Sequence, residues 1–164
     1  MQRPSRLLLD TNVWINNYLG SRPGHDAARD FITFALEREL ELYFSISSAA
    51  DIFYLLKTEF KICSRRADGG LTESAALAAT NAAWACVRNM RQLAMPVGLD
   101  ASDCWYADKL QVVHPDFEDD LIMAAAQRIH ASYLVTEDKA LIQNAVVPCA
   151  SPDRLLSLLQ ALEA

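Results

Sequence analysis

Short runs of apolar residues alternate along the chain with longer stretches in which apolar residues recur every three or four positions. Short runs bounded by polar turns are typical of buried strands, and the wider spacing is typical of helices that cover them. The pattern predicts strands over 5–9, 42–46, 97–99 and 133–135. It predicts helices over 13–19, 25–40, from a cap at Ser47 or Ser48 onward, and over 72–93, 101–110, 115–130 and 152–162.

Strands that alternate with helices predict an α/β fold with a parallel sheet covered on both faces. The sequence has 164 residues, a length that favours a single domain over 1–164. The clearest break in the pattern, Arg65 to Leu71 with its Gly69-Gly70 pair, is too short to be a linker between domains. We therefore expect one sheet with one set of covering helices.

Composition narrows the class of protein. Apolar residues make up 52% of the chain and charged residues 22%, which excludes a disordered protein. Neither a secretory leader in MQRPSRLLLD nor an apolar run long enough to cross a membrane is found, so we expect a cytoplasmic protein. The four cysteines form no C-x-x-C pair, and we interpret them as reduced core residues: Cys63, Cys86, Cys104 and Cys149.

The net charge of −6 is concentrated in one stretch. Residues 100–120 hold seven acidic residues and one basic residue, Lys109, whereas the rest of the chain is balanced. Such a stretch is either a solvated face or part of a cation site. The overall charge gives no reason to expect nonspecific affinity for nucleic acid.

Four aspartates stand where chemistry is expected in this fold. Ligands of open parallel sheets bind at the carboxyl ends of the strands. Asp10 ends the first strand, Asp51 follows the second by a few residues, Asp138 follows the 133–135 strand, and Asp119 lies in the first turn of the preceding helix. The last three also have an ordinary structural explanation, because carboxylates are favoured near helix N-termini.

Asp10 is harder to explain by structure alone, since a carboxylate that closes an apolar strand is costly to bury without a partner. Four acids that meet at one point repel one another, and a divalent cation compensates for this repulsion. Oxygen ligands with few histidines favour Mg²⁺ or Mn²⁺. The three histidines are scattered and we interpret them as surface or core residues, with only His114 near enough in sequence to approach the site.

Four segments, taken in order, carry a resemblance to a known family: LLLDTNVWINNYL, SISSAADIFYLLK, DFEDDLIMAAA and YLVTEDKAL. Together they resemble the PIN domain, and specifically the small bacterial VapC-type ribonuclease toxins, over residues 7 to about 156. The resemblance implies a three-layer α/β/α sandwich with a central, mostly parallel sheet. It also implies an acidic cluster that binds Mg²⁺ or Mn²⁺ and cleaves RNA, and a small antitoxin as partner.

The resemblance assigns roles by position. Asp10 matches the family's first acid and Asn12 the polar residue beside it, while Asp51 stands where the family more often has Glu. The D-x-L-I-x-A pattern falls on Asp119 rather than on Asp120, Thr136 matches the threonine of the last motif, and Asp138 matches the fourth acid, with Glu137 as a substitute. The basic residue that many relatives carry after the threonine is absent. Whether the protein forms a homodimer stays open.

Other classes of enzyme lack their required residues. A haloacid-dehalogenase-type phosphotransferase needs a second Asp where Asn12 stands, and a receiver domain needs an acid where Leu9 stands. Phosphate-binding glycine loops and the G-x-S-x-G motif are missing. The expected function is therefore a metal-dependent endoribonuclease, with Asp10, Asp119, Asp138 and Asp51 at the metal and with Asn12 and Thr136 as hydrogen-bonding supports. The alternative is a catalytically silent PIN-like binding module.

An acidic protein that binds RNA needs a local basic track. Lys57, Lys61 and Arg65 recur every four residues along the helix that contains Asp51, with Arg66 adjacent. This spacing predicts a basic stripe that leads away from the second acid, although evenly spaced bases are also typical of a solvated helix face.

Overall fold

The computed structural model describes residues 5–112 and 114–163. The expectation that the chain begins without a leader rests partly on residues 1–4, which lie outside this part. Within it, five strands form one sheet in the order β3-β2-β1-β4-β5, and every neighbouring pair is parallel. The strands are β1 (Arg6–Leu9), β2 (Glu41–Ser45), β3 (Met95–Val97), β4 (Tyr133–Val135) and β5 (Cys149–Ala150).

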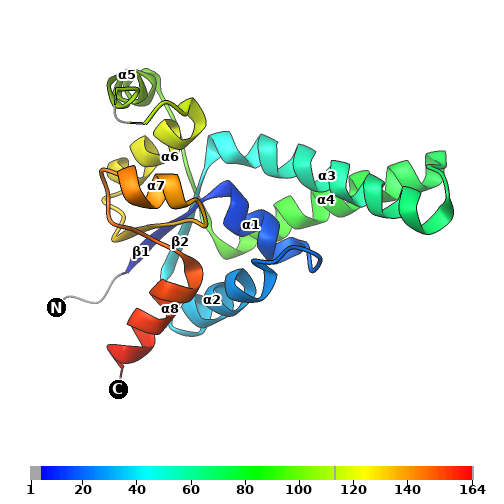
Figure 1. Ribbon diagram of the computed structural model, residues 1–164, viewed down its shortest axis with the longest axis horizontal. Helices are drawn as coiled ribbons and strands as arrows, with labels where there is room; N and C mark the ends of the chain where they lie inside the picture. Colours follow the sequence, from blue (N-terminus) through cyan, green and yellow to red (C-terminus); the bar gives the residue numbers. More distant parts are fainter. Residues whose placement is uncertain (1–4, 113, 164) are drawn as a thin grey trace.

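Helices follow the strands and cover both faces of the sheet (Figure 1). In chain order they are α1 (Thr11–Tyr18), α2 (His25–Glu37), α3 (Ile46–Asp68), α4 (Glu73–Leu93), α5 (Ala101–Leu110), α6 (Phe117–Arg128), α7 (Lys139–Asn144) and α8 (Pro152–Ala161). This is the α/β sandwich with a parallel sheet that the alternation of strands and helices predicts. No helix of the described part is long and apolar enough to span a bilayer.

Side chains along β1 point alternately to the two faces of the sheet, and the hydrophobic core has one half on each face. Leu7 and Leu9 point to one face of the sheet and pack with α1, α2 and α8, whereas Leu8 points to the other face and packs with α5, α6 and α7. All three leucines are buried. The central strand is therefore apolar on both faces, which is why it appears in the sequence as a continuous run rather than an alternating one.

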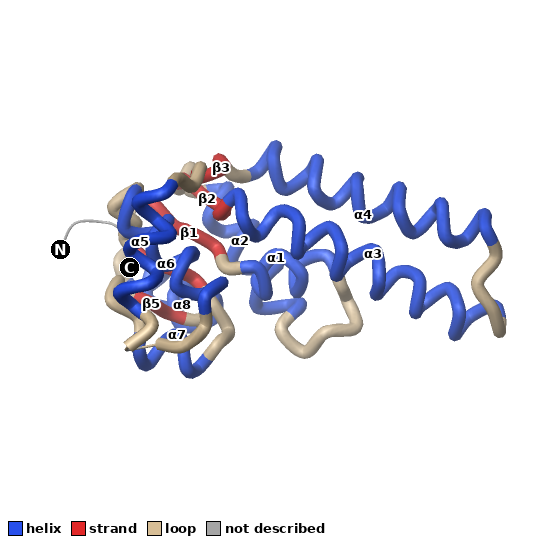
Figure 2. Tube along the Cα trace, turned by 90° about the horizontal axis from the view of Figure 1, so that it is seen from above, coloured by secondary structure: helices blue, strands red, loops and turns tan. Residues whose placement is uncertain are grey.

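Helices α3 and α4 form an antiparallel hairpin whose far end projects beyond the sheet and its other helices (Figure 2). Ile52 and Leu56 of α3, together with Val87 and Met90 of α4, anchor the near half of the hairpin in the core. The turn that joins the helices contains Gly69 at φ +70°, a left-handed conformation that glycine adopts without strain.

Several sequence expectations need correction at element boundaries. Helix α3 continues through Arg65 to Asp68, so the break begins at Gly69, and its N-cap is Ser45 rather than Ser47 or Ser48. The third strand is β3, two residues earlier than predicted, because an edge strand tolerates Pro96. The sequence pattern does not indicate β5 and α7, because two and six residues are too few for a periodic pattern.

The cysteine interpretation is only partly right. All four cysteines are free, but Cys63 and Cys104 are exposed and Cys86 and Cys149 are partly buried. The expectation that they are core residues is therefore wrong for Cys63 and Cys104. Their helices are amphipathic, and the spacing of cysteines along the sequence does not say which face each one takes.

Candidate functional site

Asp10 is a deeply buried acid at the carboxyl edge of the sheet. The residue is 3% exposed and comes directly after the three buried leucines of β1. One carboxylate oxygen accepts from the backbone N–H of Thr11 at 2.6 Å, which caps α1, and the other accepts from the Thr136 hydroxyl at 2.6 Å. Burial raises the pKa of Asp10 to about 6, the two hydrogen bonds oppose this rise, and Glu118 and Asp138 add to it.

The Thr136 hydroxyl joins the ends of β1 and β4. It donates to Asp10 and accepts from the side-chain amide of Asn12 at 3.2 Å and from the backbone N–H of Asp138 at 3.0 Å. The Asn12 carbonyl oxygen in turn accepts from the backbone N–H of Glu137 at 3.2 Å. These hydrogen bonds fix the loop after β4 against α1. They therefore also fix the position of Asp138 relative to Asp10.

Asp138 lies at the start of α7. Its Oδ1 accepts from the backbone N–H groups of Ala140 and Leu141 at 2.7 and 3.0 Å and so caps the helix. Asp138 is among the charges that raise the pKa of both Asp10 and Asp119, whereas Glu137 is not. Asp138 is therefore the acid of this loop that belongs electrostatically to the cluster.

Helix α6 supplies Asp119 to the same cluster. Asp116 caps the helix by accepting from the backbone N–H groups of Glu118 and Asp119 at 3.0 and 3.3 Å. Burial, followed by the charges of Asp10, Asp116 and Asp138, raises the pKa of Asp119 to about 7, and His114 opposes this rise. Nε2 of His114 lies 3.6 Å from Asp119, while its Nδ1 lies 3.6 Å from Asp120.

Asp119 and Asp120 differ in the charges that act on them. Asp120 is buried against His114, and neither Asp10 nor Asp138 is among the charges that perturb its pKa. Asp119 interacts with both. His114 is the one histidine at this edge within the described part of the chain. His25 instead bonds through Nδ1 to the carbonyl oxygen of Asn16 at 2.9 Å, and His130 lines a pocket elsewhere.

Asp51 stands at the rim of the cluster rather than inside it. It is exposed in the second turn of α3 and is not among the charges that perturb Asp10 or Asp119. It does interact with Glu118, whose pKa is raised first by burial and then by Asp51. The structure thus connects Asp51 to the other acids through a residue that the sequence pattern does not single out.

Glu118 is that missed residue. Its Oε1 accepts from the Thr11 hydroxyl at 3.2 Å, which places it beside the start of α1 and adjacent to Asp10. The DFEDD segment contains four acids, and the sequence alone does not say which of them turn toward the end of β1. Only the contact with Thr11, more than one hundred positions earlier, distinguishes Glu118 from its neighbours.

The carboxylates fit a divalent cation by their chemistry. They offer oxygen donors alone, no Lys or Arg ion pair with any of them is seen in residues 5–112 and 114–163, and their repulsion contributes to the raised pKa values of Asp10 and Asp119. In the same residues, no three acidic, His or Cys side chains already stand close enough together to hold a metal ion. Ion binding would therefore require these side chains to turn toward one another.

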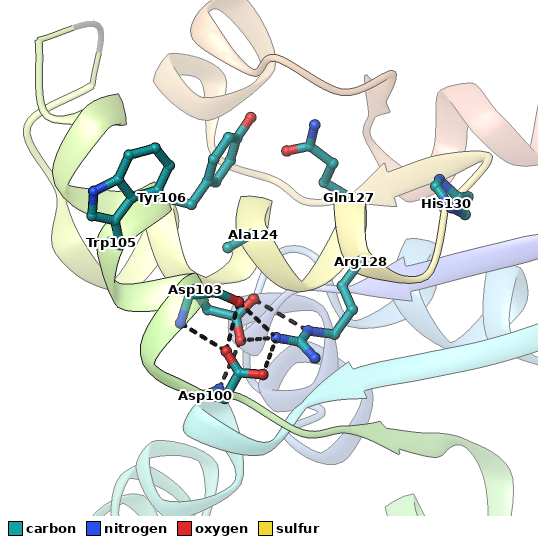
Figure 3. Close-up of a pocket in the computed structure, with 9 residues that line it drawn as sticks. Asp100, Asp103, Trp105, Tyr106, Ala124, Gln127, Arg128 and His130 are labelled. Carbon is teal, nitrogen blue, oxygen red and sulfur yellow. Dashed lines mark hydrogen bonds and ion pairs between the residues drawn. The ribbon is translucent and has the colours of Figure 1, made fainter.

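A pocket of about 480 Å³ lies at the opposite end of α6, between α5 and α6 (Figure 3). In the wall of this pocket, Arg128 forms ion pairs with Asp100 at 2.8 Å and with Asp103 at 2.6 Å. These ion pairs tie the end of α6 to the start of α5.

Comparisons with known proteins agree with this architecture. A family model described as PIN domain matches residues 6–140. A chain of VapBC2 from Rickettsia felis, solved bound to a DNA fragment from their promoter, superposes with a TM-score of 0.62 at 12% identity, covering 89% of this chain and 98% of that one. VapC20 of Mycobacterium tuberculosis, a Sarcin-Ricin loop cleaving toxin, gives a TM-score of 0.59 at 14% identity, with 85% and 96% covered. No curated protein sequence matches.

Proposed function

The chain belongs to the PIN domain family, and from this premise we propose that it is a metal-dependent endoribonuclease, the toxin of a toxin–antitoxin pair. One observation carries the proposal. Three acids from separate segments act on one another at the carboxyl edge of the sheet: Asp10, Asp119 and Asp138. The charge of Asp138 raises the pKa of both Asp10 and Asp119, and the charge of Asp10 raises the pKa of Asp119. Within the described residues, none of the three forms an ion pair with Lys or Arg. A fold that needed these acids only as helix caps would have no reason to bring them together.

Asp10, Asp119 and Asp138 would hold the metal, Mg²⁺ or Mn²⁺, with Asp51 at the rim as ligand or water-orienting base. The bound cation supplies a water of lowered pKa and neutralises charge on the scissile phosphodiester. Thr136 and Asn12 orient the acids, because their hydrogen bonds fix Asp10 and the loop that carries Asp138. Burial keeps Asp10 away from bulk water, which strengthens its interaction with a cation.

Two solved structural neighbours support the partners that we propose. The Rickettsia felis neighbour was solved as a VapBC2 complex, and we extend this pairing to the present chain by proposing a small antitoxin that covers the acidic cluster. The Mycobacterium tuberculosis neighbour is a Sarcin-Ricin loop cleaving toxin, which supports RNA as the proposed substrate class here. We propose the cytoplasm as the compartment in which the protein meets its RNA substrate.

The test is cleavage of structured RNA by the purified protein in Mg²⁺ or Mn²⁺ and in EDTA. We expect discrete cleavage products only with the metal. Asp10→Asn and Asp119→Asn should abolish the products, whereas Asp108→Asn, an exposed acid on α5, should not. Cleavage by Asp10→Asn at the wild-type rate would refute the assignment. RNA binding by a wild-type protein that cleaves nothing would favour the silent binding module.

A further inference from the structure

The α3/α4 hairpin differs in charge from the rest of the protein. Residues 46–93 hold six of the fifteen basic residues of the chain but only four of its twenty-one acidic residues. The hairpin is therefore basic although the whole protein carries a net charge of −6. Since its far end projects from the sheet (Figures 1 and 2), this basic surface is open to a large ligand.

Three basic residues of α3 lie on one side of the helix, where their like charges repel one another. Lys57, Lys61 and Arg65 are four positions apart, so they share one side of the helix, and like charges at this spacing repel one another. No acidic residue stands three or four positions from Lys57 or Lys61. Glu59, the acid between them, projects from the opposite side. Nor is an ion pair seen for any of the three bases in the described part of the chain.

Aromatic rings accompany these cations. Tyr54 is 62% exposed and lies edge-to-face with Phe53, with 5.2 Å between ring centroids. Nζ of Lys57 lies 5.8 Å from the centroid of Phe53 and 5.9 Å from that of Tyr54. Trp84 of α4 packs on Phe53 at 4.9 Å and is itself half exposed. Exposed rings beside cations are the combination with which proteins stack unpaired bases and hold the backbone of a single strand.

The same helix leads to the acidic cluster. Asp51 interacts with Glu118, and Tyr54 follows Asp51 by three positions, less than one helical turn. Beyond it the bases recur about every 6 Å along the helix axis, given a rise of about 1.5 Å per residue. A strand that leaves the cluster along α3 thus meets an aromatic ring first and three cations after it. Arg66 projects about a third of a turn away from Arg65 and lies outside this line.

We propose that this line of side chains binds a single-stranded segment of the RNA that the acidic cluster cleaves. A base stacks on Tyr54, Lys57 holds the ring in place, and Lys61 and Arg65 contact phosphates. The inference rests on the proposed function, because it takes RNA as the substrate. We call the line the α3 track; it consists of Tyr54, Lys57, Lys61 and Arg65.

The test measures binding apart from cleavage. A short fluorescent single-stranded RNA is titrated in EDTA at several salt concentrations, and the affinity is followed by anisotropy. For Lys61→Ala/Arg65→Ala we expect weaker binding and a salt dependence flatter by about 0.7 log unit per log unit of salt for each lost contact. Arg91→Ala/Arg154→Ala removes the same charge from exposed positions outside the track and should leave the slope unchanged. Both double variants are compared by thermal unfolding to show that they are folded.

A second set of variants tests the stacking contact. Tyr54→Ala should weaken binding of the single strand roughly 10-fold or more, with the salt slope unchanged, while Tyr54→Phe should restore it. Binding to a duplex of the same sequence should change less, because paired bases are not free to stack. Neither substitution alters the buried side of α3, which is formed by Ser48, Ile52 and Leu56.

The outcomes separate this inference from the proposed function. Suppose that the wild-type protein cleaves RNA and that the two double variants do not differ in the salt dependence of RNA binding. The α3 track is then refuted and the nuclease assignment stands. If Tyr54→Ala changes the sedimentation of the protein and leaves RNA binding intact, the face is a contact between copies of the chain and the track is again refuted. A wild-type protein that neither binds nor cleaves RNA refutes both.

Discussion

Asp119→Asn should stabilise the metal-free protein at about pH 8 and should stabilise it by a clearly smaller amount at about pH 5. In the folded state the pKa of Asp119 is about 7, against 3.8 for the unperturbed group. Between these values the folded protein holds a proton that the unfolded chain has released. The free energy of unfolding therefore falls as the pH rises through this interval. The loss is complete above the pKa that Asp119 has in the folded state. Asparagine carries no charge to bury and should remove the loss.

The size of the effect follows from the shift. The difference between about 7 and 3.8 corresponds to about 4 kcal/mol, at ~1.36 kcal/mol per pKa unit. This is an upper bound, because the side chain is 19% exposed and solvent screens part of the repulsion. We expect a gain of about 2 kcal/mol in the free energy of unfolding at about pH 8.

The assay is urea unfolding in EDTA at both pH values, with Asp108→Asn as the matched control. Asp108 is an exposed acid on α5, so its substitution should change stability little at either pH. Addition of Mg²⁺ at about pH 8 should stabilise the wild type and Asp108→Asn but not Asp119→Asn. An Asp119→Asn protein that is less stable than the wild type at about pH 8, or that shows the same difference at both pH values, would show that burial and repulsion within the cluster do not raise the pKa of Asp119.

Four further outcomes are expected. Thr136→Val should lower the free energy of unfolding by about 2 kcal/mol, measured in urea, because it removes one hydroxyl that serves Asp10, Asn12 and the Asp138 backbone, whereas Thr136→Ser should be near wild type. Arg128→Met should lower the melting temperature by leaving buried Asp103 without its partner, and RNA cleavage per folded molecule should not change. Asp51→Asn should reduce cleavage less than Asp10→Asn does, since Asp51 reaches the cluster only through Glu118; equal losses would place it inside the cluster. Expression of the wild type alone should arrest growth and Asp10→Asn should not, as followed by culture density, and a short partner gene should lie beside this one.

The parts of the fold that sequence predicts best are those with a continuous pattern. The pattern predicts the buried strand at 133–135 and the helix at 101–110 with the bounds that the structure shows. It does not predict β5 and α7, because two and six residues are too few to show hydrophobic periodicity. The start of α3 matters for function: because the helix begins at Ile46 and not after Ser47 or Ser48, Asp51 lies in its second turn, at the rim of the cluster.

The site was predictable in its acids but not in their arrangement. Asp10 stands out in the sequence because a carboxylate directly follows a buried strand. Glu118 does not stand out, because a short helical segment rich in acids gives no sign of which side chain meets Thr11. The Thr136 hydroxyl was expected as a support, but that it serves Asp10, Asn12 and Asp138 together depends on long-range contacts that a single sequence does not contain.

Two acids of the cluster also begin helices, and this dual use shapes how the protein can lose its activity by mutation. Asp10 caps α1 and Asp138 caps α7. Asparagine caps a helix about as well as aspartate, whereas alanine does not. A single base change converts Asp to Asn, so the most accessible inactive alleles would keep both helices and the folded surface. Cells that escape a toxin in this way would retain an inert copy that still occupies the antitoxin, and such alleles would themselves disturb the balance between the two proteins.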